Sequence, residues 1–271
     1  AFVDQLVGSL IFEFNRAFSS GAGLRGYQNL TGVYAVTDAT VPLNTAGLLF
    51  TPQNGSFQIQ VTNRNTGLTE TTDLFADLNG VGTDTSLNDL VASLDAINGI
   101  SAQVTSTGQL QITSDSTDLE FTFTSDTSGV LAALGINTFF TGSNSRDIGV
   151  NATIVSDPSL FAASQGGGPG DVSNAASLVQ FLDAPLDSLG GLSLDQSYEA
   201  LVVDTTQASA SARAVAQGME GFQQALENQF LQRTGVSIDE EAVRRAAREF
   251  KAAGVEAIAI CFLFSFLEPK H

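Results

Sequence analysis

A run of apolar and small residues between Leu194 and Leu226 recurs alternately four and three positions apart. A heptad pattern of this length is typical of a helix that packs along a second long helix. We therefore predict a stalk helix over residues 193–235. Its repeating positions are Leu194, Tyr198, Leu201, Thr205, Ala208, Ala212, Val215, Met219, Phe222 and Leu226.

The charge of the chain restricts its partners. Its 271 residues include 29 acidic and 11 basic side chains, which give a formal net charge of -18. Such a chain repels phosphate backbones and anionic lipids, so neither nucleic acid nor a membrane is an expected partner. The apolar run 257–267 is shorter than the about 20 residues that span a bilayer, and we predict a buried strand there.

The side chains used most often in catalysis gather near the C-terminus. The single Cys261 and His271 lie there, as do both lysines, Lys251 and Lys270. The preceding chain therefore lacks the thiol, imidazole and amine that most nucleophilic and zinc chemistry requires. We predict no catalytic, cofactor-binding or metal-binding residue, and we expect a protein that is not an enzyme.

Two groups of carboxylates are candidates for calcium, which accepts oxygen ligands alone. Their spacing fits no calcium loop, so helix caps and solvated turns are the favoured interpretation. The groups are Asp84, Asp89 and Asp95, and Asp115, Asp118 and Asp126.

The N-terminal segment 1–22 repeats the four-three spacing at Val3, Val7, Leu10, Phe14 and Ala17. It is predicted to be the first stalk helix, ending near residues 19–21. An ordinary amphipathic core helix is the alternative, because the segment is short for a coiled coil. In the proposed pairing, Leu6, Leu10 and Phe14 pack against Tyr198, Leu201, Met219, Phe222 and Leu226.

Residues 23–150 are predicted to form an inserted β-rich domain. From residue 55 to 125 the pattern has period two, as at Phe57, Ile59 and Val61, which indicates half-buried strands. Residues 106–108 are suited to a hairpin turn. Ser86 and Asp89 resemble a capping box at the start of a helix that covers the sheet. A short helix is expected over 126–134 and a loop over 141–151.

Residues 151–192 are predicted to connect this domain to the long helix, which is capped near Ser193. The connector holds a helix over 174–182 and the glycine-rich segment 165–170, whose composition is typical of a flexible linker. A phosphate-binding loop is the rival interpretation. It is disfavoured because no strand precedes the segment and no Gly-Lys-Ser/Thr follows it.

Residues 2–242 resemble the bacterial flagellar hook-associated protein 1 family, the first junction protein between hook and filament. The resemblance rests on the segments Leu10–Arg16, Phe50–Phe57, Asp126–Phe140 and Gly235–Glu241. It implies an axial helical part and an outward β-rich part in an extracellular flagellar protein exported without a cleaved signal peptide. The implied partners are the hook protein, other hook-associated proteins, copies of the same chain and an export chaperone.

The C-terminal segment 236–271 departs from that family. It reads as a helix, a glycine stop and a continuous apolar strand, which is typical of an α/β unit. Residues 239–271 resemble the hydantoinase A and oxoprolinase family, an ATP-linked group with an actin-like fold. That family uses the segment as scaffold, so no catalytic role passes to Cys261 or His271. We therefore expect a truncated or chimeric chain.

Taken together, the sequence predicts an α+β protein: a coiled-coil stalk of long helices, an inserted sheet-and-helix domain and a short helix-strand tail. The function expected first is a structural one, assembly and motility at the flagellar hook-filament junction. The alternative is a fragment of an ATP-dependent hydantoinase/oxoprolinase-type amidohydrolase. Nucleotide binding distinguishes the two, since only the alternative requires it.

Overall fold

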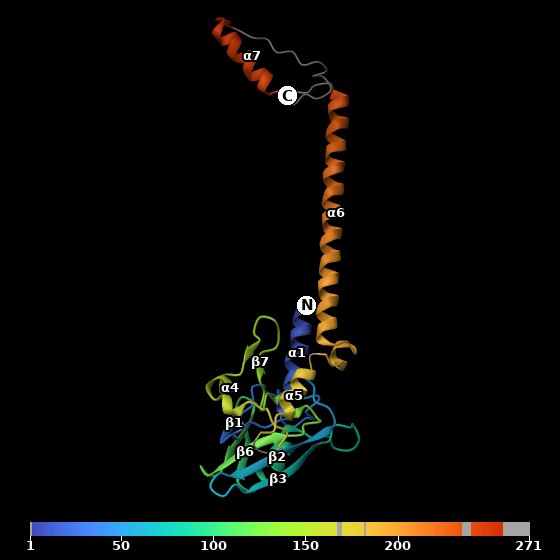
Figure 1. Ribbon diagram of the computed structural model, residues 1–271. Coiled ribbons are helices and arrows are strands. Elements are labelled where there is room, and N and C mark those ends of the chain that lie inside the picture. Colours follow the sequence, from blue (N-terminus) through green and yellow to red (C-terminus); the bar gives the residue numbers. More distant parts are fainter. Residues whose placement is uncertain (1, 167–169, 182, 235–239, 257–271) are drawn as a thin grey trace. The chain divides into compact units, whose positions relative to one another are not determined.

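The computed structural model describes residues 2–166, 170–181, 183–234 and 240–256 (Figure 1). The chain divides into two compact units, Ala1–Val202 and Val203–His271. The first unit is α+β and takes in the predicted segments 1–22, 23–150 and 151–192. The boundary between the units falls within the long helix α6, Leu194–Thr234.

The N-terminal helix α1 spans Phe2–Ser19, as the sequence predicts, and packs on α3, α5 and β7. Ile11 and Phe18 are fully buried on its inner side. Asn15 is also buried, and its Oδ1 accepts hydrogen bonds from the backbone N–H groups of Phe139 and Phe140 at 3.0 and 2.9 Å. Both apolar burial and a buried polar contact therefore hold α1 in the first unit.

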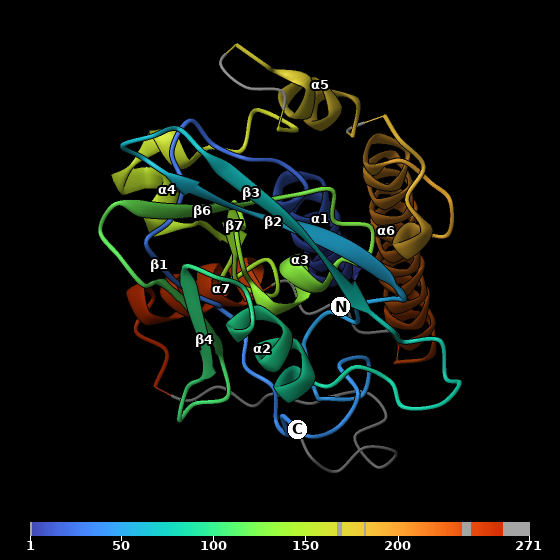
Figure 2. The same ribbon diagram turned by 90° about the horizontal axis from the view of Figure 1, so that it is seen from below.

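The larger sheet contains β2 (Gly55–Asn63), β3 (Thr69–Ala76) and β6 (Leu119–Thr124) in the order β3-β2-β6, all antiparallel. Figure 2 shows these three strands side by side. The alternation seen in the sequence has its expected result, because Phe57, Ile59 and Val61 are buried. The intervening side chains point to the opposite face of the sheet.

The smaller sheet contains β1 (Asn29–Thr31), β5 (Leu110–Ser114) and β4 (Ile100–Val104), in the order β1-β5-β4. Its β4-β5 hairpin turns where predicted, with Gly108 at φ +82. Just before β1, Tyr27 forms an isolated antiparallel bridge with Phe121 of β6. This short segment therefore contacts both sheets.

Helix α2, Leu87–Asp95, packs against β4 and β3, and its capping box is present as predicted. The backbone N–H of Ser86 donates to Asp89 Oδ2 at 2.9 Å, and the Asp89 N–H donates to Ser86 Oγ at 3.2 Å. Leu87, Leu90 and Leu94 are buried on one side of the helix. They belong to the same core as Phe18, Phe57 and Phe123.

The short helix predicted over 126–134 begins later, as α3 at Val130–Leu134. The reason lies in Asp126, whose buried carboxylate accepts backbone hydrogen bonds from Ser128, Gly129 and Leu131. Burial raises the pKa of this carboxyl, while the donors around it act in the opposite direction. The segment 126–129 is therefore a side-chain-stabilised turn that leads into the helix.

The segment 141–151, expected as a loop, contains a short hairpin instead, formed by β7 (Phe140–Thr141) and β8 (Gly149–Val150). Asp147 stabilises its turn by accepting hydrogen bonds from the N–H groups of Ser143 and Asn144, both at 2.8 Å. The two-residue strands are too short for a period-two pattern to be recognised in the sequence. After them come α4 (Ala152–Ser156) and a 3-10 turn at Pro158–Leu160.

Helix α5 spans Ser173–Gln180 and contacts α1, close to the predicted 174–182. A second 3-10 turn, Asp187–Leu189, comes before α6. A reciprocal pair of hydrogen bonds caps the start of α6: the Ser193 N–H donates to Gln196 Oε1, and the Gln196 N–H donates to Ser193 Oγ. The glycine-rich segment lies partly outside the described residues, and its linker role stays a prediction.

The second unit contains α6 from Val203 onward and α7, Glu240–Ala252. The predicted glycine stop is present after α7, where Gly254 has φ +73 and donates its N–H to the carbonyl of Lys251. This conformation is the common way to end a helix. The strand predicted over 257–267 lies outside the described residues.

Candidate functional site

The stalk residues predicted on α1 are half-buried in the first unit. These half-buried residues are Leu6, Leu10 and Phe14. The Phe14 ring packs against Phe139, Phe140 and Phe181, with centroid distances of 5.5, 5.0 and 5.7 Å. Phe14 therefore contacts aromatic rings of its own unit. Such contacts are expected if α1 is an ordinary amphipathic core helix, the alternative to a stalk helix.

At the start of α6, neighbouring positions differ in exposure. Ser197 is buried and Leu201 is half-buried, whereas Tyr198 is 58% exposed. Leu194, Ser197 and Leu201 lie three and four residues apart, so they share one side of the helix. Leu201 is thus partly covered, whereas Tyr198 is mostly exposed.

Further along α6, the predicted packing residues are exposed: Met219 at 67%, Phe222 at 62% and Leu226 at 50%. The rest of residues 203–233 is exposed as well. The long helix itself is confirmed, and its pairing with Leu6, Leu10 and Phe14 stays a prediction.

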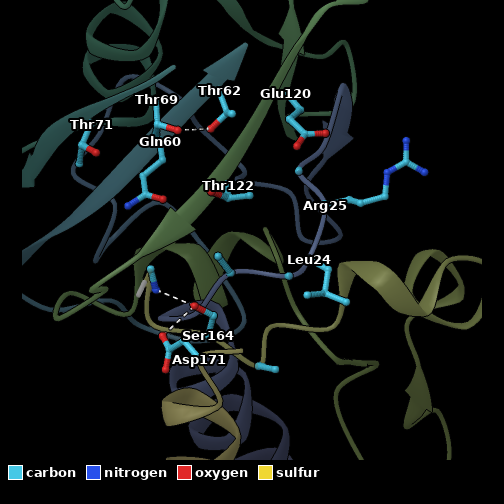
Figure 3. A pocket seen from close by; sticks show the side chains of 15 residues that line it. Leu24, Arg25, Gln60, Thr62, Thr69, Thr71, Glu120, Thr122, Ser164 and Asp171 are labelled. Carbon is cyan, nitrogen blue, oxygen red and sulfur yellow. Dashed lines mark hydrogen bonds between the residues drawn. The ribbon is translucent and has the colours of Figure 1, made fainter. Parts of the chain in front are cut away.

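A polar groove of about 500 Å³ lies over the outer face of the larger sheet, and the sequence did not predict it (Figure 3). Threonine and glutamine side chains from all three strands line it, together with Leu24 and Arg25 from the segment after α1. Across from them, Ser164 Oγ donates a hydrogen bond to Asp171 Oδ2 at 2.8 Å. The strand residues are Gln60, Thr62, Thr69, Thr71, Glu120 and Thr122.

A second hollow of about 270 Å³ shares Arg25 and Glu120 with this groove. Glu120 lies 3.8 Å from the Nε of Arg64, at salt-bridge distance. Nearby, hydrogen bonds from Ser159 lower the pKa of Asp157, and the charge of Arg25 adds to the effect. The two hollows together offer hydroxyls, amides and charges of both signs, which suit hydrogen bonding to a polar ligand.

Several of the carboxylates considered for calcium accept hydrogen bonds within the fold. Asp84 accepts from the N–H of Gly80, Asp89 caps α2, and Asp95 accepts from the N–H of Ala102. Asp115 accepts from the Ser101 hydroxyl. Within the described ranges, no three His, Cys, Asp or Glu side chains are grouped so that they could hold a metal ion.

The helices described here include none that is both long and apolar enough to cross a membrane. The C-terminal residues Cys261 and His271 lie outside the described ranges, so their surroundings are not assigned.

In a comparison with known families, residues 196–271 match the hydantoinase/oxoprolinase N-terminal region. No curated protein matches the chain. The match covers α6 from its first turn, all of α7 and the segment that follows, so it begins well before residue 239, where the sequence resemblance was placed.

This match corrects one expectation and supports another. The expectation that the chain is not an enzyme is wrong, because the matched region is one that enzymes carry. The resemblance of the C-terminal segment to the hydantoinase and oxoprolinase family is supported. The resemblance to hook-associated protein 1 receives no support from the comparisons.

Proposed function

We propose that the chain acts as part of an ATP-dependent amidohydrolase of the hydantoinase/oxoprolinase type. The observation that carries the proposal is the family match over residues 196–271. In the sequence an apolar segment follows the left-handed Gly254 that ends α7, which is the order expected of a helix followed by a buried strand.

This proposal predicts chemistry on a cyclic amide. The purified chain is incubated with ATP, Mg²⁺ and either hydantoin or 5-oxoproline, and the release of phosphate and of the ring-opened product is followed. We expect phosphate release that depends on the cyclic amide. Equal phosphate release with and without the amide contradicts the proposal.

A second candidate function is assembly at the flagellar hook-filament junction. The observation that favours it is the exposed apolar side of α6, which includes Met219, Phe222 and Leu226. An apolar stripe at heptad spacing calls for a partner helix. In this reading the protein works outside the cell with the hook protein, other hook-associated proteins and copies of itself, and an export chaperone delivers it.

The assembly function is tested by binding to purified hook protein. We expect the Phe222→Asp/Leu226→Asp variant to lose binding, because charges on the apolar stripe prevent helix packing. The matched control, Gln217→Asp/Gln224→Asp, adds the same charges on the other side of α6 and should bind as the parent does. Equal binding by both variants contradicts the assembly function.

A further inference from the structure

The α6 segment 203–234 has the properties of a helix that needs a partner. Its described side chains up to residue 233 are exposed, including Val215 at 67%, Met219 at 67% and Phe222 at 62%. Long helices of globular proteins gain most of their stability from packing one apolar side. Gly218 and Gly221 weaken the isolated helix further, by about 1 kcal/mol each relative to Ala.

The residues of this segment at the four-three spacing are called the seam here. Small seam residues lie in one half of the segment and large ones in the other. The first half carries the smaller side chains, at Thr205, Ala208 and Ala212. The second half carries the larger ones, at Val215, Met219 and Phe222. The spacing is four and three throughout, so all six positions fall on one side of the helix.

This division fits an antiparallel pair of identical helices. If the two-fold axis passes between Arg213 and Ala214, residues of one copy face partner residues whose numbers sum to 427. Each small side chain then meets a large one. The facing pairs are Thr205 with Phe222, Ala208 with Met219, and Ala212 with Val215.

A parallel pair in register would place Phe222 against Phe222 and Ala208 against Ala208. The helices would then be forced apart at one end and leave unfilled space at the other, which close packing disfavours. Charge also permits self-pairing here. Although the whole chain has a net charge of -18, segment 203–234 holds three acidic and two basic residues, a net charge of -1.

We propose that the occupant of this surface is a second copy of the chain, with the two α6 segments paired antiparallel through these six positions. The pairing rests on the assembly function proposed for α6 and names its partner. It is isologous, so the same surface serves both copies and the contact closes at two chains.

The test measures the mass of the full chain in solution and the distance between spin labels. Spin labels are attached to a cysteine introduced by Gln217→Cys or Gln224→Cys in a Cys261→Ser background. Residues 217 and 224 are exposed and lie on the side of α6 opposite the seam. We expect a dimer. Antiparallel pairing predicts axial separations between the two labels of about 10 Å at residue 217 and about 32 Å at residue 224.

Parallel pairing in register gives the same separation at both positions and overturns the inference, as does a monomer. A second variant, Met219→Asp/Phe222→Asp, should lose the dimer together with part of the helical circular dichroism of α6, because the unpaired helix has no packed side. The control Gln217→Asp/Gln224→Asp should remain dimeric. Because these measurements use the chain alone, they are independent of hook-protein binding, and a monomer that still binds hook protein leaves the assembly function standing.

Discussion

The hydroxyl of Tyr27 donates a buried hydrogen bond to Oδ1 of Asn137 at 2.9 Å. Asn137 has φ +49, and its Nδ2 donates in turn to the carbonyl of Gly21 at 2.9 Å. The contact joins the turn after α3 to two neighbouring parts of the N-terminal region, the turn after α1 and the segment before β1 that contacts both sheets. It therefore fixes the N-terminal helix to the β-rich part of the first unit.

Replacing Tyr27 with Phe should lower the free energy of unfolding by roughly 1–3 kcal/mol, because it leaves a buried acceptor on Asn137 without its donor. Urea unfolding followed by far-ultraviolet circular dichroism measures the change. Tyr34→Phe is the control, since the Tyr34 hydroxyl donates to the carbonyl of Gly142 at a partly buried site. A larger loss of unfolding free energy in Tyr34→Phe than in Tyr27→Phe would contradict the importance of the Tyr27 contact for stability.

Replacing Ser86 with Ala should lower the free energy of unfolding by about 1 kcal/mol, because the capping hydrogen bond at the start of α2 is lost. Ser93→Ala lies on the same helix, where Ser93 Oγ donates to the Asp89 carbonyl. That control should be neutral, since Ala favours the helix interior. Equal effects of the two substitutions would show that Ser86 does not act as a cap.

Gly108→Ala should destabilise the β4-β5 hairpin more than Gly67→Ala destabilises the β2-β3 turn. Both glycines are left-handed, at φ +82 and φ +72, so both variants carry backbone strain of about 1–2 kcal/mol. At Gly108 the new Cβ would also lie 2.5 Å from the carbonyl oxygen of Val36, whereas at Gly67 no atom lies within 4 Å. Thermal unfolding of the two variants compares their stabilities directly. An equal loss of stability would contradict a close approach between residue 108 and the Val36 carbonyl.

Tyr34 should titrate well above the ordinary tyrosine range. Burial raises its pKa to about 12, and the charge of Asp147 adds to the shift. Because the folded state holds this proton more tightly than the unfolded chain, its contribution to stability is complete below pH 10 and is lost as the pH rises toward 12. The titration is followed by absorbance at 295 nm, and the step that is missing in Tyr34→Phe belongs to Tyr34. Titration of Tyr34 near pH 10 would contradict its burial.

Features encoded by neighbouring residues could be predicted from the sequence. The capping box at Ser86, the hairpin at Gly108 and the period-two burial of Ile59 each depend on a few adjacent positions. The late start of α3 could not be predicted. It depends on the burial of Asp126, which tertiary packing decides.

Contacts between distant segments were also beyond the sequence. The Tyr27–Phe121 bridge and the polar groove exist only because β6, β2 and the segment after α1 are brought together. The threonines at 62, 69, 71 and 122 predict polar strand faces, and nothing in their spacing indicates a shared groove. On α6, the heptad pattern correctly predicts the helix, but it does not distinguish the exposed Tyr198 from the half-buried Leu201.

Calorimetric titration of the full chain with ATP and Mg²⁺ tests the proposed function most directly, because an ATP-dependent amidohydrolase must bind the nucleotide. We predict a saturable heat of binding at one site per chain. The result that would contradict the account is the absence of any heat for a chain whose circular dichroism shows that it is folded.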